Sequence, residues 1–117
     1  MKSLIFLFLI LTSISNIKGD YSISPFLNFL QENGLYDFLA SIKHYFGDDI
    51  CIDICKELTK TYDCYTLVKI YFPSNSRGIV ENGEAEKIMD EYEPNLRTAG
   101  YKSFEIKRMR DILMRAG

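Results

Sequence analysis

The sequence of 117 residues has few of the side chains that build metal and redox centres: three cysteines and one histidine. A structural zinc site takes four cysteine or histidine ligands at firm spacings, and the three cysteines together with His44 follow no common zinc pattern. A thioredoxin-like site requires Cys-x-x-Cys, whereas three residues separate Cys51 from Cys55. We therefore expect neither a metal nor another cofactor.

Catalytic groups are also scarce. His44 has no obvious serine or cysteine partner. Asp48 and Asp49 lie just before a predicted helix, where the helix dipole favours them as capping residues rather than as a catalytic pair. We therefore expect a protein that is not an enzyme. Because the chain has no Asn-x-Ser/Thr sequon, we expect no N-glycosylation either.

A long apolar run occurs only at the start of the chain. It covers residues 4–11, follows Lys2 and precedes small and polar residues. This layout is typical of a secretory signal peptide, and the run is too short to span a bilayer. We assign residues 1–19 to the signal peptide, with cleavage after Ser15 or Gly19. The protein is then expected to be secreted or to stay in the lumen of the endoplasmic reticulum.

The charges of the remaining chain are unevenly distributed. Without Lys2 and Lys18 it has 12 basic and 16 acidic residues, a net charge of about −4, which argues against nucleic acid as a partner. Residues 81–93 carry six acids and one base, whereas residues 102–115 carry five bases and two acids. This pattern indicates an antiparallel helix pair with complementary faces. The alternative is a functional basic surface on the last helix, formed by Lys107, Arg108, Arg110 and Arg115.

Apolar spacing predicts an all-α fold, a small bundle of four to five short helices. We expect the first helix to start at Ser24-Pro25 and Gly34 to separate it from the next. The segment 64–72 has strand-like composition but also a helical stripe, and we predict a helix because the chain offers no partner strand. Pro94 is expected to end the acidic helix.

The cysteines are expected to form one disulfide, because the secretory route is oxidising. Cys51 and Cys55 lie one helical turn apart, where a bond between them would be awkward. Cys64 can instead join either of them across the turn at 59–63, which makes a helix–turn–helix staple worth about 2–3 kcal/mol. The remaining thiol is then either buried or links two chains in a disulfide-bonded homodimer.

Two segments of the chain resemble parts of one family. The segment 54–67, ICKELTKTYDCYTL, resembles the closing disulfide hairpin of saposin-like domains. The segment 102–117, KSFEIKRMRDILMRAG, resembles the second helix of a SAP domain, in which apolar residues at helical intervals precede a glycine. A saposin-like part followed by a SAP-like part in a secreted protein is similar to the ARMET-like neurotrophic factors.

The resemblance implies a disulfide between Cys55 and Cys64, with Cys51 as the odd thiol. It also implies a saposin-like N-terminal part at 20–78 and a SAP-like helical hairpin at 79–117. Proteins of this family are non-enzymatic and act in the endoplasmic reticulum and outside cells, where they contact protein partners and lipids.

Three functions are consistent with the sequence. The first is a small secretory-pathway protein that binds a protein partner through its last helix, in the manner of an ARMET-like stress or trophic factor. The second is a peptide-hormone precursor cleaved at the dibasic pair Lys107-Arg108. The third is a saposin-like binder of lipids or membranes, which the aromatic and apolar side chains of 26–46 suggest.

Overall fold

The computed structural model describes residues 18–72 and 80–116, and within these ranges every regular element is a helix. This confirms the all-α prediction, although the described part has six helices rather than four to five. None of them is both long and apolar enough to cross a membrane. Residues 1–17 of the predicted signal peptide lie outside the described ranges. The helices are α2 (Lys18–Glu32), α3 (Tyr36–Phe46), α4 (Asp48–Leu58), α5 (Cys64–Tyr71), α6 (Glu84–Thr98) and α7 (Ser103–Ala116).

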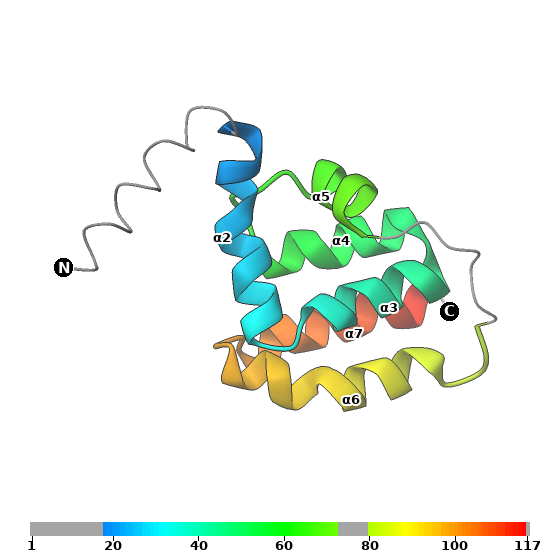
Figure 1. Cartoon of the computed structure of the whole chain (residues 1–117). Helices are drawn as coiled ribbons and strands as arrows, with labels where there is room; N and C mark the ends of the chain where they lie inside the picture. Colours follow the sequence, from blue (N-terminus) through cyan, green and yellow to red (C-terminus); the bar gives the residue numbers. More distant parts are fainter. Residues whose placement is uncertain (1–17, 73–79, 117) are drawn as a thin grey trace.

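Four of these helices form a closed ring of contacts: α3 packs on α4, α4 on α7, α7 on α6, and α6 on α3. The helix α2 packs on α3 and runs across the direction of the ring helices, while α5 packs on α4 (Figure 1). One continuous hydrophobic core joins all of them, so the helices up to residue 72 and those from residue 84 on bury their apolar faces together. Its largest fully buried side chains are Phe38, Leu30, Leu35, Leu39, Ile42, Ile54, Leu67, Met89, Leu96, Met109, Leu113 and Val68.

The turn between α2 and α3 depends on a glycine, as the Asn33-Gly34 pair predicts. Gly34 has a φ of 69°, in the left-handed region, and the backbone N–H of Leu35 donates to the carbonyl of Leu30 at 2.7 Å. The Asn95 amide donates to the Asn33 carbonyl at 3.0 Å. A Cβ at Gly34 would lie 2.7 Å from Asn95 Nδ2. Glycine therefore permits both the turn and the close approach of α6.

Both proline predictions are wrong. The first helix of the described ranges begins at Lys18 rather than beside Pro25, and Pro94 lies inside α6, which continues to Thr98. A proline removes one intrahelical hydrogen bond and crowds the preceding turn. Here the turn after each proline carries a buried side chain, Leu30 after Pro25 and Leu96 after Pro94, both with no exposed surface. Burial in the core outweighs the local cost.

The segment that begins at Cys64 is helical, which confirms the choice of helix over strand. Asp63 is its N-cap: its carboxylate accepts a hydrogen bond from the backbone N–H of Thr66 at 3.2 Å and from the Thr66 hydroxyl at 2.7 Å. These bonds hold the pKa of Asp63 below its usual range. The cap fixes the start of α5 immediately before its cysteine.

Candidate functional site

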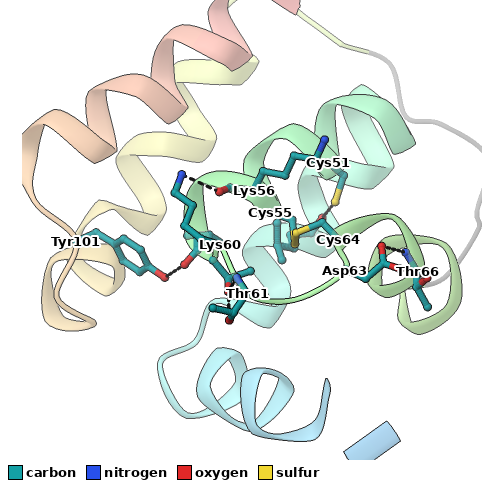
Figure 2. The surroundings of a disulfide bond; sticks show 12 residues. Cys51, Cys55, Lys56, Lys60, Thr61, Asp63, Cys64, Thr66 and Tyr101 are labelled. Carbon is teal, nitrogen blue, oxygen red and sulfur yellow. Dashed lines mark hydrogen bonds between the residues drawn. A yellow bond between two sulfur atoms is a disulfide. The ribbon is translucent and has the colours of Figure 1, made fainter. Parts of the chain in front are cut away.

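The disulfide joins Cys55 and Cys64, as predicted, with the two Cα atoms 5.8 Å apart. It connects the last turn of α4 to the first turn of α5 (Figure 2). Both cysteines are buried, and the turn between them is exposed at Lys60 and Thr61. The bond therefore holds two short helices together from the inside.

The end of α4 is also fastened to the other half of the chain. The Tyr101 hydroxyl, from the turn before α7, donates to the carbonyl of Leu58 at 2.6 Å (Figure 2). The Lys60 ammonium donates to the carbonyl of Lys56 at 3.2 Å. Both bonds satisfy carbonyls at a helix C-terminus, which have no partner within the helix. Burial raises the pKa of Tyr101 to about 12, so its hydroxyl stays a donor.

Cys51, the third cysteine, has a free thiol with no exposed surface. Its Sγ lies 3.4 Å from the Leu39 carbonyl, to which it donates. Burial raises the pKa of the thiol to about 12. The sequence left open whether this thiol is buried or links two chains, and the structure places it in the core. A bond to a second chain requires a sulfur at the surface, which this fold does not provide.

We expect Cys51 in the folded protein to react with iodoacetamide at least about 100-fold more slowly than in the unfolded protein, because burial blocks access and suppresses the thiolate. Mass spectrometry should find one alkylated cysteine per chain after unfolding without reductant. Fast labelling under native conditions would contradict the enclosed position of Cys51.

Sequence reasoning missed a buried lysine, Lys43 on α3, whose side chain is only 6% exposed. Its ammonium donates to the carbonyls of Val68 at 2.8 Å and Phe72 at 2.9 Å, at the end of α5. Its spacing was a signal, because Lys43 follows Leu39 by one helical turn and precedes Phe46 by another, and both face the core. Lys43 therefore provides hydrogen-bond donors for carbonyls at the C-terminal end of α5, as a C-cap normally does.

The carboxylate of Asp48 shares this position. It lies 3.6 Å from the ammonium of Lys43 and 2.9 Å from that of Lys69. The hydrogen bond from Lys69 contributes most to holding the pKa of Asp48 below its usual range. The prediction that Asp48 or Asp49 caps α4 is wrong, since Gly47 is the N-cap residue and no side chain caps this end. Asp48 instead neutralises the buried charge of Lys43.

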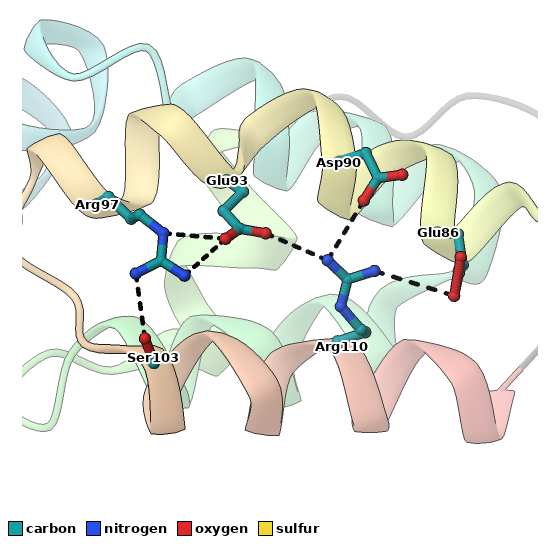
Figure 3. A network of polar contacts seen from close by, with 6 residues as sticks. All are labelled: Glu86, Asp90, Glu93, Arg97, Ser103 and Arg110. Atoms are coloured by element: carbon teal, nitrogen blue, oxygen red, sulfur yellow. Dashed lines mark hydrogen bonds and ion pairs between the residues drawn. The ribbon is translucent and has the colours of Figure 1, made fainter.

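The four basic residues predicted as an interaction surface divide into two groups. Arg110 points toward α6, where its guanidinium lies 3.3 Å from Glu93, 3.4 Å from Asp90 and 4.0 Å from Glu86 (Figure 3). Arg97 binds Glu93 as well, at 2.7 Å, and its hydrogen bond is the main reason that the pKa of Glu93 is lowered. Arg110 therefore belongs to the α6–α7 contact, and these ion pairs confirm that the two helices have complementary faces.

Within the described residues, the other three bases form no ion pair with α6, and all three are exposed. The Lys107 ammonium pairs with Asp111 on the same helix at 3.1 Å, and its side chain is 73% exposed. Arg108 pairs with Glu57 of α4 at 3.0 Å and is 53% exposed. Arg115 lies in the exposed last turn of α7. These side chains remain accessible to a partner.

Large apolar side chains are exposed beside these bases. Phe104 is 56% exposed, with the guanidinium of Arg108 5.3 Å from its ring centroid, and Met114 is 49% exposed. The residues follow one another at helical spacing on one side of the helix. We call this surface the outer face of α7; it consists of Phe104, Lys107, Arg108, Asp111, Met114 and Arg115.

No family model, curated protein or solved structure matches this chain.

The described residues offer little chemistry elsewhere. No group of three or more histidine, cysteine, aspartate or glutamate side chains is placed to hold a metal ion. His44 stacks edge-on against Tyr45 near the end of α3. A shallow depression of about 310 Å³ lies between the α2–α3 turn and α6, and its lining is polar: Glu32, Asn33, Gly34, Pro94, Asn95 and Thr98. The outer face of α7, which combines exposed apolar and cationic side chains on one helix, is the candidate site.

Proposed function

We propose that this is a small, non-enzymatic protein of the secretory pathway that acts by binding another protein through the outer face of α7. One observation carries the proposal: α7 is buried on one side and exposes an aromatic ring, a methionine and three cations on the other. The inward side chains Ile106, Met109 and Leu113 are 3%, 0% and 0% exposed. Packing of α7 in the core therefore uses none of the outer residues.

The composition of the outer face is that of a binding surface. Arginine, methionine and aromatic residues are enriched where proteins bind one another. Phe104 and Arg108 lie against each other, so together they present a flat apolar surface with a fixed charge. The exposed apolar surfaces of Phe104 and Met114 are available to be covered by a partner.

The sequence resemblance supports the same class of function. The disulfide hairpin occurs within 54–67, and a helix with a buried apolar stripe occurs within 102–117, the two segments similar to ARMET-like factors. We propose a stress-related or trophic role of that kind, in the lumen of the endoplasmic reticulum or outside the cell.

The same observations disfavour the two other functions. The bond after Arg108, which cleavage at the dibasic pair would break, lies in the middle of α7, whereas a processing protease requires an extended chain. The apolar residues of 26–46 that suggested lipid binding form the core: Phe26, Leu30, Leu35, Phe38, Leu39, Ile42 and Phe46 are at most 5% exposed. Neither function gains support from the fold.

Reversing the charge of Lys107 and Arg115 together, by Lys107→Glu and Arg115→Glu, is expected to abolish capture of partner proteins from a lumenal extract. Both residues are exposed, and the ion pair of Lys107 is with Asp111 of the same helix, so the free energy of unfolding should change by less than about 1 kcal/mol. The measurement is a pull-down with tagged protein, with captured proteins quantified by mass spectrometry.

The matched control reverses two exposed lysines outside α6 and α7, Lys56→Glu and Lys60→Glu, and should capture as the unmodified protein does. Circular dichroism verifies that both variants are folded. Capture that survives reversal on α7, or is lost equally in the control, would rule out the outer face as the binding surface.

A further inference from the structure

We infer that the protein bound by the outer face of α7 is a second copy of this chain, which contributes the acidic side of its α6. The inference rests on the proposed function, because it uses the same surface, and it identifies the partner. The dimer is held by ion pairs and apolar contacts rather than by a disulfide, since Cys51 is enclosed in the core.

Each copy carries both halves of the required contact side by side. The exposed acids of α6 border α7: Asp90 is 71% exposed and Glu86 51% exposed. Their ion pairs with Arg110 are long, at 3.4 and 4.0 Å, and leave most of each carboxylate in solvent. The exposed bases Lys107 and Arg115 of α7 thus lie next to the exposed acids of α6. When a second copy is rotated by 180° and faces the first, bases lie opposite acids on both sides of the contact.

The level of the residues along the two helices permits a symmetric contact. The helices are antiparallel, with Arg97 beside Ser103 at 3.1 Å and Arg110 beside Asp90 at 3.4 Å (Figure 3). Consider a two-fold axis that runs parallel to the two helices, above the line where they meet. Rotation by 180° about this axis places α7 of one copy over α6 of the other. It does not change the position of any residue along the helix direction. The contact is then made twice, as an isologous dimer requires.

This arrangement pairs specific residues between the copies. Lys107 of one copy lies level with Asp90 and Glu93 of the other, and Arg115 lies level with Glu86. Phe104 lies opposite the exposed ring of Pro94, so its apolar surface is covered as well. Lys107, which also pairs with Asp111 on its own helix, and Arg115 thereby each gain an acidic partner in the second copy.

A membrane surface fits this part of the molecule less well. An anionic bilayer would attract Lys107 and Arg115 but repel Asp90 and Glu86 directly beside them. The chain as a whole has a formal net charge of −2, which adds to that repulsion. A surface of mixed charge, such as that of a second copy, meets neither difficulty.

The test is a charge exchange read out by sedimentation velocity over a series of concentrations. Because the contact is small, we expect the unmodified protein to dimerise with a Kd of about 10–100 µM and more weakly as salt is raised. Lys107→Glu with Arg115→Glu, and separately Glu86→Lys with Asp90→Lys, should each raise this Kd at least about tenfold per reversed residue. An equimolar mixture of the two variants should form a heterodimer again, because the reversed charges match.

The control is Glu91→Lys, which makes the same charge change on α6 but about 100° around the helix from Asp90, and it should dimerise normally. Circular dichroism checks that each variant is folded. A further measurement needs no variant: carbodiimide cross-linking of mixed ¹⁴N- and ¹⁵N-labelled protein should link Lys107 of one copy to Asp90 or Glu93 of the other.

The inference is overturned if the unmodified protein stays monomeric up to about 1 mM, or if mixing the variants restores no heterodimer. It is equally overturned if vesicles rich in phosphatidylserine bind the monomer in a manner that requires Lys107 and Arg115. A monomer that still captures a different lumenal protein through these two residues defeats the inference and leaves the proposed function standing.

Discussion

Replacing Lys43 with methionine is expected to lower the free energy of unfolding by about 2–4 kcal/mol. Methionine retains most of the packing volume but cannot donate a hydrogen bond. The carbonyls of Val68 and Phe72 would lose a charged donor in a buried place where water cannot replace it. Asp48 would lose its inner partner and keep Lys69. Urea unfolding followed by circular dichroism measures the difference.

The control is Lys69→Met. This lysine binds the same carboxylate at 2.9 Å, but its side chain is 42% exposed. An exposed ion pair contributes at most about 1 kcal/mol, because water solvates both charges once it is broken. Equal losses in the two variants would show that Lys43 acts only as the partner of Asp48. A loss below about 0.5 kcal/mol for Lys43→Met would show that it does not hold the end of α5 at all.

The second large effect concerns the disulfide. Replacing both Cys55 and Cys64 with alanine is expected to lower the free energy of unfolding by about 2–3 kcal/mol. The bond joins two cysteines that are nine positions apart in the sequence, and it therefore limits the conformations of the unfolded chain. Urea unfolding under identical conditions measures the change. The native contacts of α5, including the Asp63 cap, should remain.

Reductant provides the internal control for this prediction. It should destabilise the unmodified protein by about the same amount as the double replacement and have no effect on the double variant. A separate Cys51→Ala variant should keep its response to reductant, because Cys51 takes no part in the bond. An unmodified protein whose urea midpoint is insensitive to reductant would contradict a structural role for the disulfide.

Much of the fold follows from local pattern. The spacing of Leu39, Ile42 and Phe46 determines which side of α3 is buried, and all three lie in the core. The pair Asn33-Gly34 marks a turn because glycine adopts a positive φ at little cost. The cysteine spacing restricted the disulfide to two pairings, and the resemblance to a saposin-like hairpin selected the observed one.

Local pattern failed where distant contacts outweigh local preference. Pro25 and Pro94 are helix breakers when only their neighbours are considered, yet each lies within a helix whose next turn is anchored in the core. Asp48 has the position of a capping residue, but its carboxylate forms ion pairs with Lys43 of α3 and Lys69 of α5 instead. The energy of burial or of an ion pair exceeds the local cost in each case, and neither depends on adjacent residues.

The bases of α7 show the same difference between what local sequence indicates and what distant contacts decide. Composition alone makes Lys107, Arg108, Arg110 and Arg115 equivalent, since all lie on one basic helix. The position of α6 turns Arg110 inward toward three carboxylates, and the position of α4 gives Arg108 a partner in Glu57. Lys107, Arg108 and Arg115 therefore stay exposed on the outer face of α7, whereas Arg110 does not.

The sequence by itself determined that this chain is helical, where most of its helices lie, and that one disulfide joins two of them. These properties arise from the periodicity of apolar residues and from cysteine spacing, both of which act over a few turns of chain. The tertiary structure alone decided that Cys51 is buried, that Lys43 completes the end of α5, and which bases of α7 are free to bind. Those outcomes depend on which helices become neighbours, because burial and pairing are properties of side chains brought together from distant parts of the sequence.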